Sequence, residues 1–293
     1  MLLALAALWG ASFMFIKVGV RELAPATLIC FRVALGALTL LPVALVTVGP
    51  RELVRGLRDA AAPLAVVGLL NSALPITVLA WAEKRVDSGL AAVIQASAPL
   101  FTALLAVRFS RDEIVTGSRL VGLLVGFGGV ALLVGVQPSG NVLSAAAITF
   151  TAFCYAVAAL YSARALAHVP PLVTAVGALA AASLILAPFA IAEPPHAVPG
   201  WKVTGSLLAL GILGTGVAYV LYYALLAGAG ASRSILITYL VPALALAYGA
   251  ILLGEPVTVS AVAGLALVLA GVALGTGAIR PARTRAPVPE ARG

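Results

Sequence analysis

Long apolar runs constrain this chain more than any other feature. The run "AAPLAVVGLLNSALPITVLAWA" (61–82) is one of several that recur along the whole sequence. A helix needs about 20 apolar residues to cross the roughly 30 Å of hydrocarbon in a bilayer. Hydrophobic residues make up 62% of the chain and charged residues only 10%, and the mean hydropathy is +1.14. These values leave too few charges to cover a water-facing surface, so the sequence predicts an all-α membrane protein.

Breaks at charged residues, prolines and Gly/Asn clusters divide the apolar sequence into ten predicted transmembrane helices. They cover residues 2–19, 25–48, 61–82, 88–108, 116–136, 142–164, 171–192, 202–226, 233–253 and 257–278. The first run has no basic leader and no small-residue cleavage site, which favours a membrane helix over a signal peptide. The Pro/Arg/Ala-rich segment 279–293 is expected to be a disordered tail.

The positions of lysine and arginine predict the orientation of the chain. If the N-terminus is cytoplasmic, five basic residues fall outside (Lys17, Arg21, Lys84, Arg85 and Lys202) and Arg32 falls within the second span. The other twelve fall inside, at positions 51, 55, 58, 108, 111, 119, 164, 233, 280, 283, 285 and 292. The positive-inside rule therefore predicts a multi-pass membrane protein with both termini and the tail cytoplasmic.

The same distribution explains the net charge of +8 without a nucleic-acid partner, because no basic-aromatic binding motif is present. Cysteine and histidine occur singly, at Cys30, Cys154, His168 and His196, with no metal-ligand spacing. We therefore expect no metal, no cofactor and no enzymatic activity. The expected partners are the lipid bilayer and a small-molecule substrate, with the protein a monomer or a weak homodimer.

An internal repeat relates the two halves of the sequence. Pro99 matches Pro242 at an offset of 143 residues, and Glu113 matches Glu255 at 142. Three glycine pairs share the offset of 142: 122 with 264, 129 with 271 and 135 with 277. Such a constant register predicts two copies of one unit, at 1–136 and 142–278. Because each unit has five spans, the second enters the membrane upside down. This gives two inverted-topology five-helix repeats, an architecture typical of alternating-access transporters.

The ordered motifs resemble the EamA family of the drug/metabolite transporter superfamily. They are "ALWGASFMFIKVGV" (7–20), "FRVALGAL" (31–38), "SAPLFTALLA…DE" (97–113), "GLLVGFGGVALLVG" (122–135), "YLVPALALAYGAILLGE" (239–255) and "GLALVLAGVALGTG" (264–277). The resemblance covers about residues 1–278 and implies a ten-helix inner-membrane carrier that exports amino acids or other small metabolites. The second unit has Tyr155 where an EamA unit often has tryptophan, and Ala178 where the first unit has Arg32.

Polar and aromatic side chains on otherwise apolar spans are the candidates for lining a substrate pathway. Helical spacing places several of them on shared faces. The candidates are Trp9, Phe13, Asn71, Gln95, Thr102, Tyr155, Thr215, Tyr219, Tyr223, Thr238 and Tyr239. Packing, a membrane-interface belt or hydrogen bonds that hold helices together would also account for such residues. We interpret them as a surface that stacks on a flat or apolar substrate and bonds its polar end.

Three further features bear on mechanism. Arg32 either snorkels to the outer surface or attracts an anionic substrate. Pro99 and Pro242 are expected to kink two gating helices, and Glu255 to cap the hairpin in which it lies. No acidic residue lies deep in a predicted span, which favours facilitated export or a coupling group at a helix end.

Hydrophobic or aromatic amino acids are the favoured substrates. One alternative is a sugar-phosphate or nucleotide-sugar antiporter, which needs more intramembrane cations than Arg32 alone. A membrane-embedded lipid-modifying enzyme would need clustered acids, histidines or metal ligands. A channel would need a polar filter.

Overall fold

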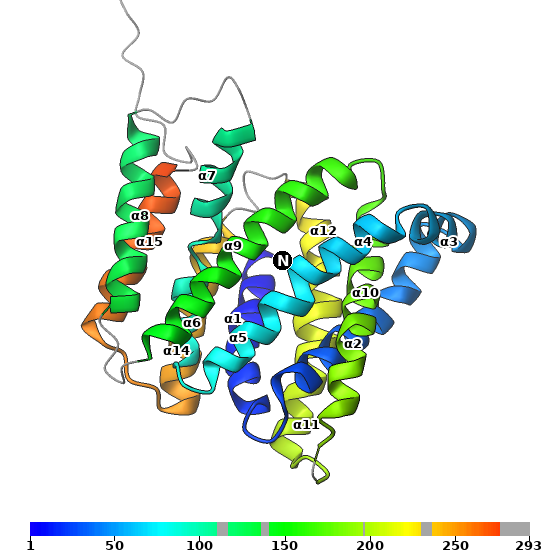
Figure 1. The fold of residues 1–293 in the computed structure, drawn as a ribbon, viewed down its shortest axis with the longest axis horizontal. Coiled ribbons are helices and arrows are strands. Elements are labelled where there is room, and N and C mark those ends of the chain that lie inside the picture. The colour runs from blue at the N-terminus through cyan, green and yellow to red at the C-terminus, as the bar shows by residue number, and fades with distance from the viewer. Residues whose placement is uncertain (110–116, 136–140, 196, 230–235, 276–293) are drawn as a thin grey trace, which may run out of the picture.

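The computed structural model describes residues 1–109, 117–135, 141–195, 197–229 and 236–275, and over these residues the chain is helical, without a strand (Figure 1). The α-helices are α1 (Leu2–Gly19), α2 (Pro25–Thr47), α3 (Pro50–Asp59), α4 (Ala61–Gly68), α5 (Leu74–Glu83), α6 (Ser88–Gln95), α7 (Ala98–Phe109), α8 (Ser118–Gly135), α9 (Val142–Ala165), α10 (Pro171–Ala192), α11 (Trp201–Leu208), α12 (Ala218–Ala229), α14 (Ile237–Leu253) and α15 (Val259–Gly275). Two π-helical segments, η1 (Leu69–Ala73) and η2 (Ala209–Val217), join α4 to α5 and α11 to α12. The predicted tail at 279–293 and Glu113 lie outside the described residues.

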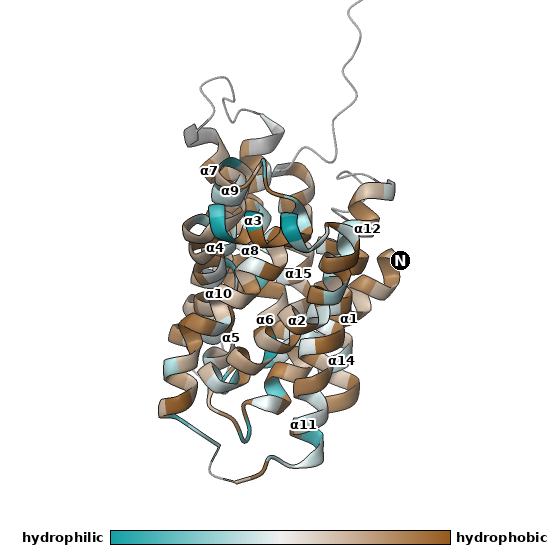
Figure 2. Ribbon diagram, turned by 90° about the vertical axis from the view of Figure 1, so that its right-hand side faces the viewer, coloured by the Kyte–Doolittle hydropathy of each residue, from teal (hydrophilic) through white to brown (hydrophobic). Residues whose placement is uncertain are grey.

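Seven helical segments in the described part of the chain are long and apolar enough to cross a membrane. Three shorter apolar helices, Leu120–Gly135, Ile237–Leu253 and Val259–Gly275, accompany them. Each corresponds to a predicted span. Large apolar side chains such as Leu38, Leu184 and Ile251 point outward, as they do in a protein whose surroundings are lipid. Hydrophobic residues run along the helices while hydrophilic ones concentrate toward their ends (Figure 2). The protein is therefore a multi-pass membrane protein.

Among the helices of the described residues, α3 is the one that the apolar pattern did not predict. Pro50 occupies its first turn, where the missing N–H removes no helical bond. Only Leu53 is fully buried, whereas Arg51, Arg55 and Arg58 are exposed. A short helix with one buried residue has no run of apolar residues long enough to signal a span, so the sequence indicated only a basic connection here.

The α-helix is interrupted in the third, fourth and eighth spans, near the middle of each. In the fourth span, α6 ends at Gln95 and α7 begins at Ala98. Pro99 explains this break, because proline lacks an N–H and clashes with the carbonyl four residues earlier, that of Gln95. Its repeat partner Pro242 lies inside α14, which continues without interruption. The π-helical segments η1 and η2 occupy corresponding places in the third and eighth spans. π-turns of this kind are frequently found at functional sites.

Contacts between the two halves are reciprocal. Helix α1 packs against α14, and correspondingly α9 packs against α6 and α7. Helix α2 packs against η2, and α10 packs against α4 and η1. The third span packs against α9 through α5, and correspondingly the eighth span packs against α1 through α11, η2 and α12. Other large contacts join sequence-equivalent helices: α2 with α10, α6 with α14, and α8 with α15. Exchanging each helix for its partner in the other half therefore leaves this set of contacts unchanged.

Glycines allow α8 and α15 to approach closely, and the pair stands together at one edge of the bundle (Figure 1). A Cβ atom on Gly271 would lie 2.3 Å from the Cα of Gly126. A Cβ on Gly122 would lie 2.4 Å from the backbone nitrogen of Gly275. Close backbone packing at small residues is the main source of helix association in a membrane, where lipid weakens the hydrophobic driving force.

Replacing Gly271 by alanine is expected to separate α8 from α15, because no flexible side chain lies opposite to yield. Such overpacking costs about 1–3 kcal/mol, and should lower the melting temperature of the detergent-solubilised protein. Gly128→Ala is the matched control, since nothing lies within 4 Å of a Cβ at that position on the same helix pair. Equal melting temperatures for the two variants would contradict the proposed packing role.

Candidate functional site

A cavity of about 1240 Å³ lies between the two halves of the bundle. Its lining comes from α1, α2, the α4–η1–α5 and α6–α7 spans, α9, α10, the η2–α12 span and α14. Helices α8 and α15 contribute little, with Leu123 and Gly275 at the margin. Both sequence units therefore build one site, and the glycine-packed pair supports it from the edge.

The cavity is closed toward one end of the bundle and reaches solvent at the other. Ile16, Leu79 and Ala92, all buried, line it toward the closed end. At the opposite end the lining includes the exposed residues Ala163 and Ala167, where α9 ends and α10 begins. The structure therefore shows a conformation with access from a single side.

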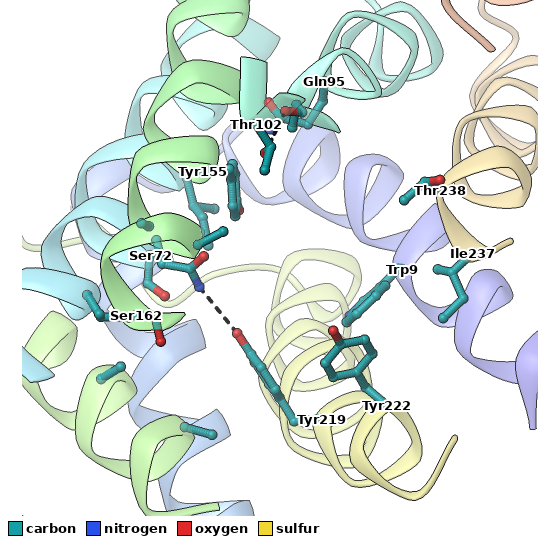
Figure 3. A pocket seen from close by; sticks show the side chains of 18 of the residues that line it. Trp9, Ser72, Gln95, Thr102, Tyr155, Ser162, Tyr219, Tyr222, Ile237 and Thr238 are labelled. Carbon is teal, nitrogen blue, oxygen red and sulfur yellow. Dashed lines mark hydrogen bonds between the residues drawn. The ribbon is translucent and has the colours of Figure 1, made fainter. Parts of the chain in front are cut away.

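The cavity brings together nearly all the residues predicted to line a pathway (Figure 3). Its lining includes Trp9, Phe13, Arg32, Asn71, Gln95, Pro99, Thr102, Tyr155, Thr215, Tyr219, Tyr223, Thr238 and Pro242. Tyr239 is absent from the lining, and its side chain packs against the hydrophobic core. The binding role of these residues stays a prediction.

Arg32 is the cationic side chain in this lining. It is only 9% exposed, and its Nε donates a hydrogen bond to Thr215 Oγ1 at 3.1 Å. Thr215 lies in η2, so a residue of the second unit orients an arginine of the first. The alternative that Arg32 snorkels to the membrane surface is wrong, because its guanidinium is held inside the protein. With Nε engaged, the terminal amino groups remain available to a carboxylate.

Hydrogen bonds between helices fix the polar side chains around the cavity. Asn71 in η1 donates through Nδ2 to the Tyr219 hydroxyl at 3.4 Å, as the dashed line in Figure 3 shows. Thr151 Oγ1 donates to the side-chain oxygen of Gln95, joining α9 to α6. Each pair crosses from one unit to the other. Gln95 and Asn71 therefore form hydrogen bonds between helices, and both also line the cavity.

Aromatic rings form a continuous cluster on one wall. The ring centroids of Trp9 and Tyr222 are 5.6 Å apart, those of Tyr222 and Tyr223 are 5.5 Å apart, and those of Tyr219 and Tyr223 are 5.9 Å apart. These separations are typical of interacting aromatic pairs. The cluster offers apolar faces next to Arg32, so the site combines a hydrophobic wall with a cation.

Sequence reasoning missed some small polar lining residues. Ser12, Ser72, Ser162 and Thr174 all line the cavity. Serine and threonine also bond to their own helix backbone, as Ser12 Oγ does to the carbonyl of Leu8, so their presence in a span carries little signal. Tyr222 also lines the site, beside the predicted Tyr223.

Polar contacts hold the closed end together. Lys17 Nζ donates to the carbonyls of Glu83 and Val86, at 2.5 and 2.8 Å, and so joins α1 to the end of α5. The Glu255 carboxylate accepts bonds from the backbone nitrogen and hydroxyl of Ser88 and from the nitrogen of Gly89, at 2.8–3.1 Å. Glu255 is therefore a cap, as expected, but it caps α6 of the other unit and not its own hairpin.

Two other acids lie at this end. Burial raises the pKa of Asp87, and the nearby Glu255 raises it further. Glu83 directly follows the predicted span 61–82, and it is the last residue of α5, yet its exposure is 0%.

The EamA-like transporter family matches the chain twice, at residues 1–135 and 143–276. The chain belongs to the EamA-like transporter family. As a family member it is a transporter and not an enzyme.

Relatives with similar sequences agree with this assignment. An uncharacterized transporter of Archaeoglobus fulgidus is 30% identical, over 90% of this chain and 93% of the relative. The inner membrane transporter YedA of Escherichia coli is 29% identical, over 91% and 85%. A probable terminal-alkyne amino-acid exporter of Streptantibioticus cattleyicolor is 29% identical, over 91% and 89%. One crystal structure shares the fold, with a TM-score of 0.67 at 20% identity over 96% of this chain and 97% of the other.

Removing the Glu255 carboxylate should loosen the closed end. Glu255→Ala leaves three donors at the start of α6 without their acceptor, a loss of roughly 1–3 kcal/mol. A lower melting temperature in detergent is the expected result. Asp59→Ala, which removes an exposed carboxylate at the end of α3, should change the melting temperature little. If both variants melt like the wild type, the capping bonds do not stabilise the closed end.

Proposed function

We propose that this EamA-like transporter exports small carboxylate-bearing metabolites, with hydrophobic or aromatic amino acids as the favoured substrates. The observation that carries the proposal is the position of Arg32, buried in the cavity wall with its Nε held by Thr215 and an aromatic cluster nearby. The guanidinium is suited to a carboxylate, and the rings to an apolar side chain.

The transport cycle we propose is alternating access by two inverted repeats of five helices, corresponding to the units 1–136 and 142–278. The two separate family matches and the reciprocal helix contacts support this division. Oppositely inserted copies can exchange the roles of open and closed gate around a central site. Because the cavity is lined by one chain, a monomer or a weak homodimer is sufficient for transport.

We assign the open end of the cavity to the cytoplasm. Helix α3, with three exposed arginines, packs near this end, since a Cβ on its Gly56 would lie 2.9 Å from Val173 near the start of α10. Basic residues concentrate on the cytoplasmic side of membrane proteins. This orientation makes the conformation inward-facing, in the inner membrane, with both termini cytoplasmic.

The substrate class has support from a relative. The Streptantibioticus cattleyicolor protein is named a probable terminal-alkyne amino-acid exporter, and the similarity covers most of both chains. An amino-acid substrate also fits the charge of the cavity better than a phosphorylated sugar does. A dianionic phosphate is usually bound by several cationic donors, and among the described lining residues Arg32 is the one with a full positive charge.

Arg32→Gln should reduce counterflow of labelled phenylalanine in proteoliposomes about tenfold or more, because a charge-assisted bond to the carboxylate is lost. Flux of phenethylamine, which lacks the carboxylate, should fall much less. Arg55→Gln, which changes an exposed arginine on α3, serves as the control and should leave both fluxes unchanged.

The same assay tests the substrate class with a panel of labelled amino acids and phosphorylated sugars. Flux of a sugar phosphate with no flux of any amino acid would overturn the proposal. An equal fall in phenylalanine and phenethylamine flux in Arg32→Gln would show that Arg32 does not bind the substrate carboxylate.

Tyr219 separates the aromatic contribution from the polar one. Tyr219→Phe removes only the hydroxyl that accepts a bond from Asn71 and should lower flux by less than about threefold. Tyr219→Ala also removes the ring from the aromatic wall, so counterflow of phenylalanine should fall more than that of alanine. Wild-type flux in both variants, with normal membrane expression, would remove Tyr219 from the pathway.

A further inference from the structure

A wholly buried carboxyl group lies beyond the closed end of the cavity. Glu83 is the last residue of α5 and lies one helical turn from Leu79, which lines the cavity toward that end. Its side chain is 0% exposed, although the residue stands at the end of a span, where acids usually reach water. Substrate contacts do not explain this burial, because Glu83 is not part of the cavity lining.

The carboxyl group of Glu83 also lacks hydrogen-bond partners. Among the described residues, neither of its oxygens accepts or donates a bond, and both are buried. Lys17 is close, but its ammonium donates to the backbone carbonyls of Glu83 and Val86. Glu255 provides the contrast at the same end of the bundle, because its carboxylate accepts three hydrogen bonds. Unlike Glu255, the Glu83 carboxyl group therefore holds no helices together by hydrogen bonds among the described residues.

Charged groups surround Glu83 from several elements. Lys17 on α1 and Arg32 on α2 attract an ionised carboxylate at this position, while Glu255, which follows α14, repels it. Asp87 lies four residues further along the chain and is about half buried. The two cations stabilise the ionised form of Glu83, and the neighbouring carboxylate destabilises it. Burial without a hydrogen bond therefore decides whether the closed end accommodates the ionised or the protonated form.

A buried carboxylate without donors is strongly disfavoured, whereas the protonated acid is tolerated. The closed end therefore accommodates Glu83 with a proton bound. When α1, α5, α6 and α14 separate at this end, water reaches the group and the ionised form becomes acceptable. Closing this gate and binding a proton are then linked, because each favours the other.

We propose that Glu83 is the binding site for a proton that the transporter exchanges for its substrate. The inference rests on the proposed export function. In the cycle, Glu83 binds a proton from the outside when its end is open, and the neutral acid allows that end to close. Loss of the proton toward the cytoplasmic cavity leaves a buried carboxylate, which favours reopening with substrate bound. The Lys17 ammonium nearby repels metal cations, so a proton and not a sodium ion fits the site.

The test uses the full-length protein in proteoliposomes, with labelled phenylalanine and the membrane potential clamped. Vesicles one pH unit more acidic inside should accumulate phenylalanine up to about tenfold with the wild type, since one pH unit equals a factor of ten in proton activity. Glu83→Gln keeps the size of the side chain and its neutral state. This variant should retain counterflow within about threefold and lose the accumulation driven by the pH gradient.

Asp87→Asn is the matched control, because it neutralises a neighbouring acid and should preserve the accumulation. Normal pH-driven accumulation by Glu83→Gln, or its loss in Asp87→Asn alone, would overturn the inference. Accumulation driven by a sodium gradient would also overturn the inference. The same holds if phenylalanine transport by the wild type does not respond to the pH gradient. Absence of any amino-acid counterflow in the wild type would instead contradict the proposed function.

If Glu83→Gln does not fold, a pH-sensitive dye inside vesicles with the wild-type protein tests whether protons are exchanged for phenylalanine. Phenylalanine added outside should then raise the internal pH, and no change would overturn the inference. Glu83→Asp should keep that signal at least in part, because it shortens the acid by one methylene and keeps its titratable group.

Discussion

A polar group inside the bilayer is costly unless it finds a partner within the protein, because lipid offers none. The backbone meets this constraint by forming helices. The side chains meet it across helices, and in this protein the main bonds of the cavity join one half of the chain to the other. Arg32 is held by Thr215, Asn71 by Tyr219 and Gln95 by Thr151. The groups that can recognise a substrate are therefore also the groups that connect the two halves, so rearranging one half changes the site directly.

The constraint also explains the difference between the two gates. At the closed end, Lys17 and Glu255 replace water as partners for backbone groups at the ends of α5 and α6. At the open end, the exposed Ala163 and Ala167 line the route into the cavity. Closure thus depends on a few charged side chains at helix ends, whereas the glycine-packed pair α8 and α15 stays apart from the cavity and provides support.

Much of the fold could be predicted from the sequence, because the length of an apolar run is fixed by the thickness of the membrane. The ten predicted spans correspond to helices that begin and end within a few residues of the expected positions, and prolines and charges set most boundaries. Helix α3 was missed because only Leu53 is fully buried there. The π-helical segments were missed because a wider turn has no residue pattern that distinguishes it from an α-turn.

The candidate site could be predicted less completely. Aromatic and amide side chains in apolar spans are rare enough to be conspicuous, and nearly all of those predicted line the cavity. Burial is a property of the packed structure, however, and periodicity does not reveal it at the end of a span. Glu83 has the sequence position of a surface acid and the surroundings of a core residue. Likewise, Glu255 reaches a helix of the other half, a contact that no local pattern encodes.

The segments η1 and η2 have a consequence for how the spans can move. Asn71 lies in the first and Thr215 in the second, so each wide turn sits where a cavity side chain is attached. An α-helix advances about 100° for each residue, and a π-turn stores one additional residue. If that residue shifts along the helix, only the stretch between its old and new positions rotates, by about 100°, while both ends stay anchored. A shift of the additional residue past Asn71 or Thr215 can therefore turn that side chain toward or away from the substrate, without lengthening or breaking the helix.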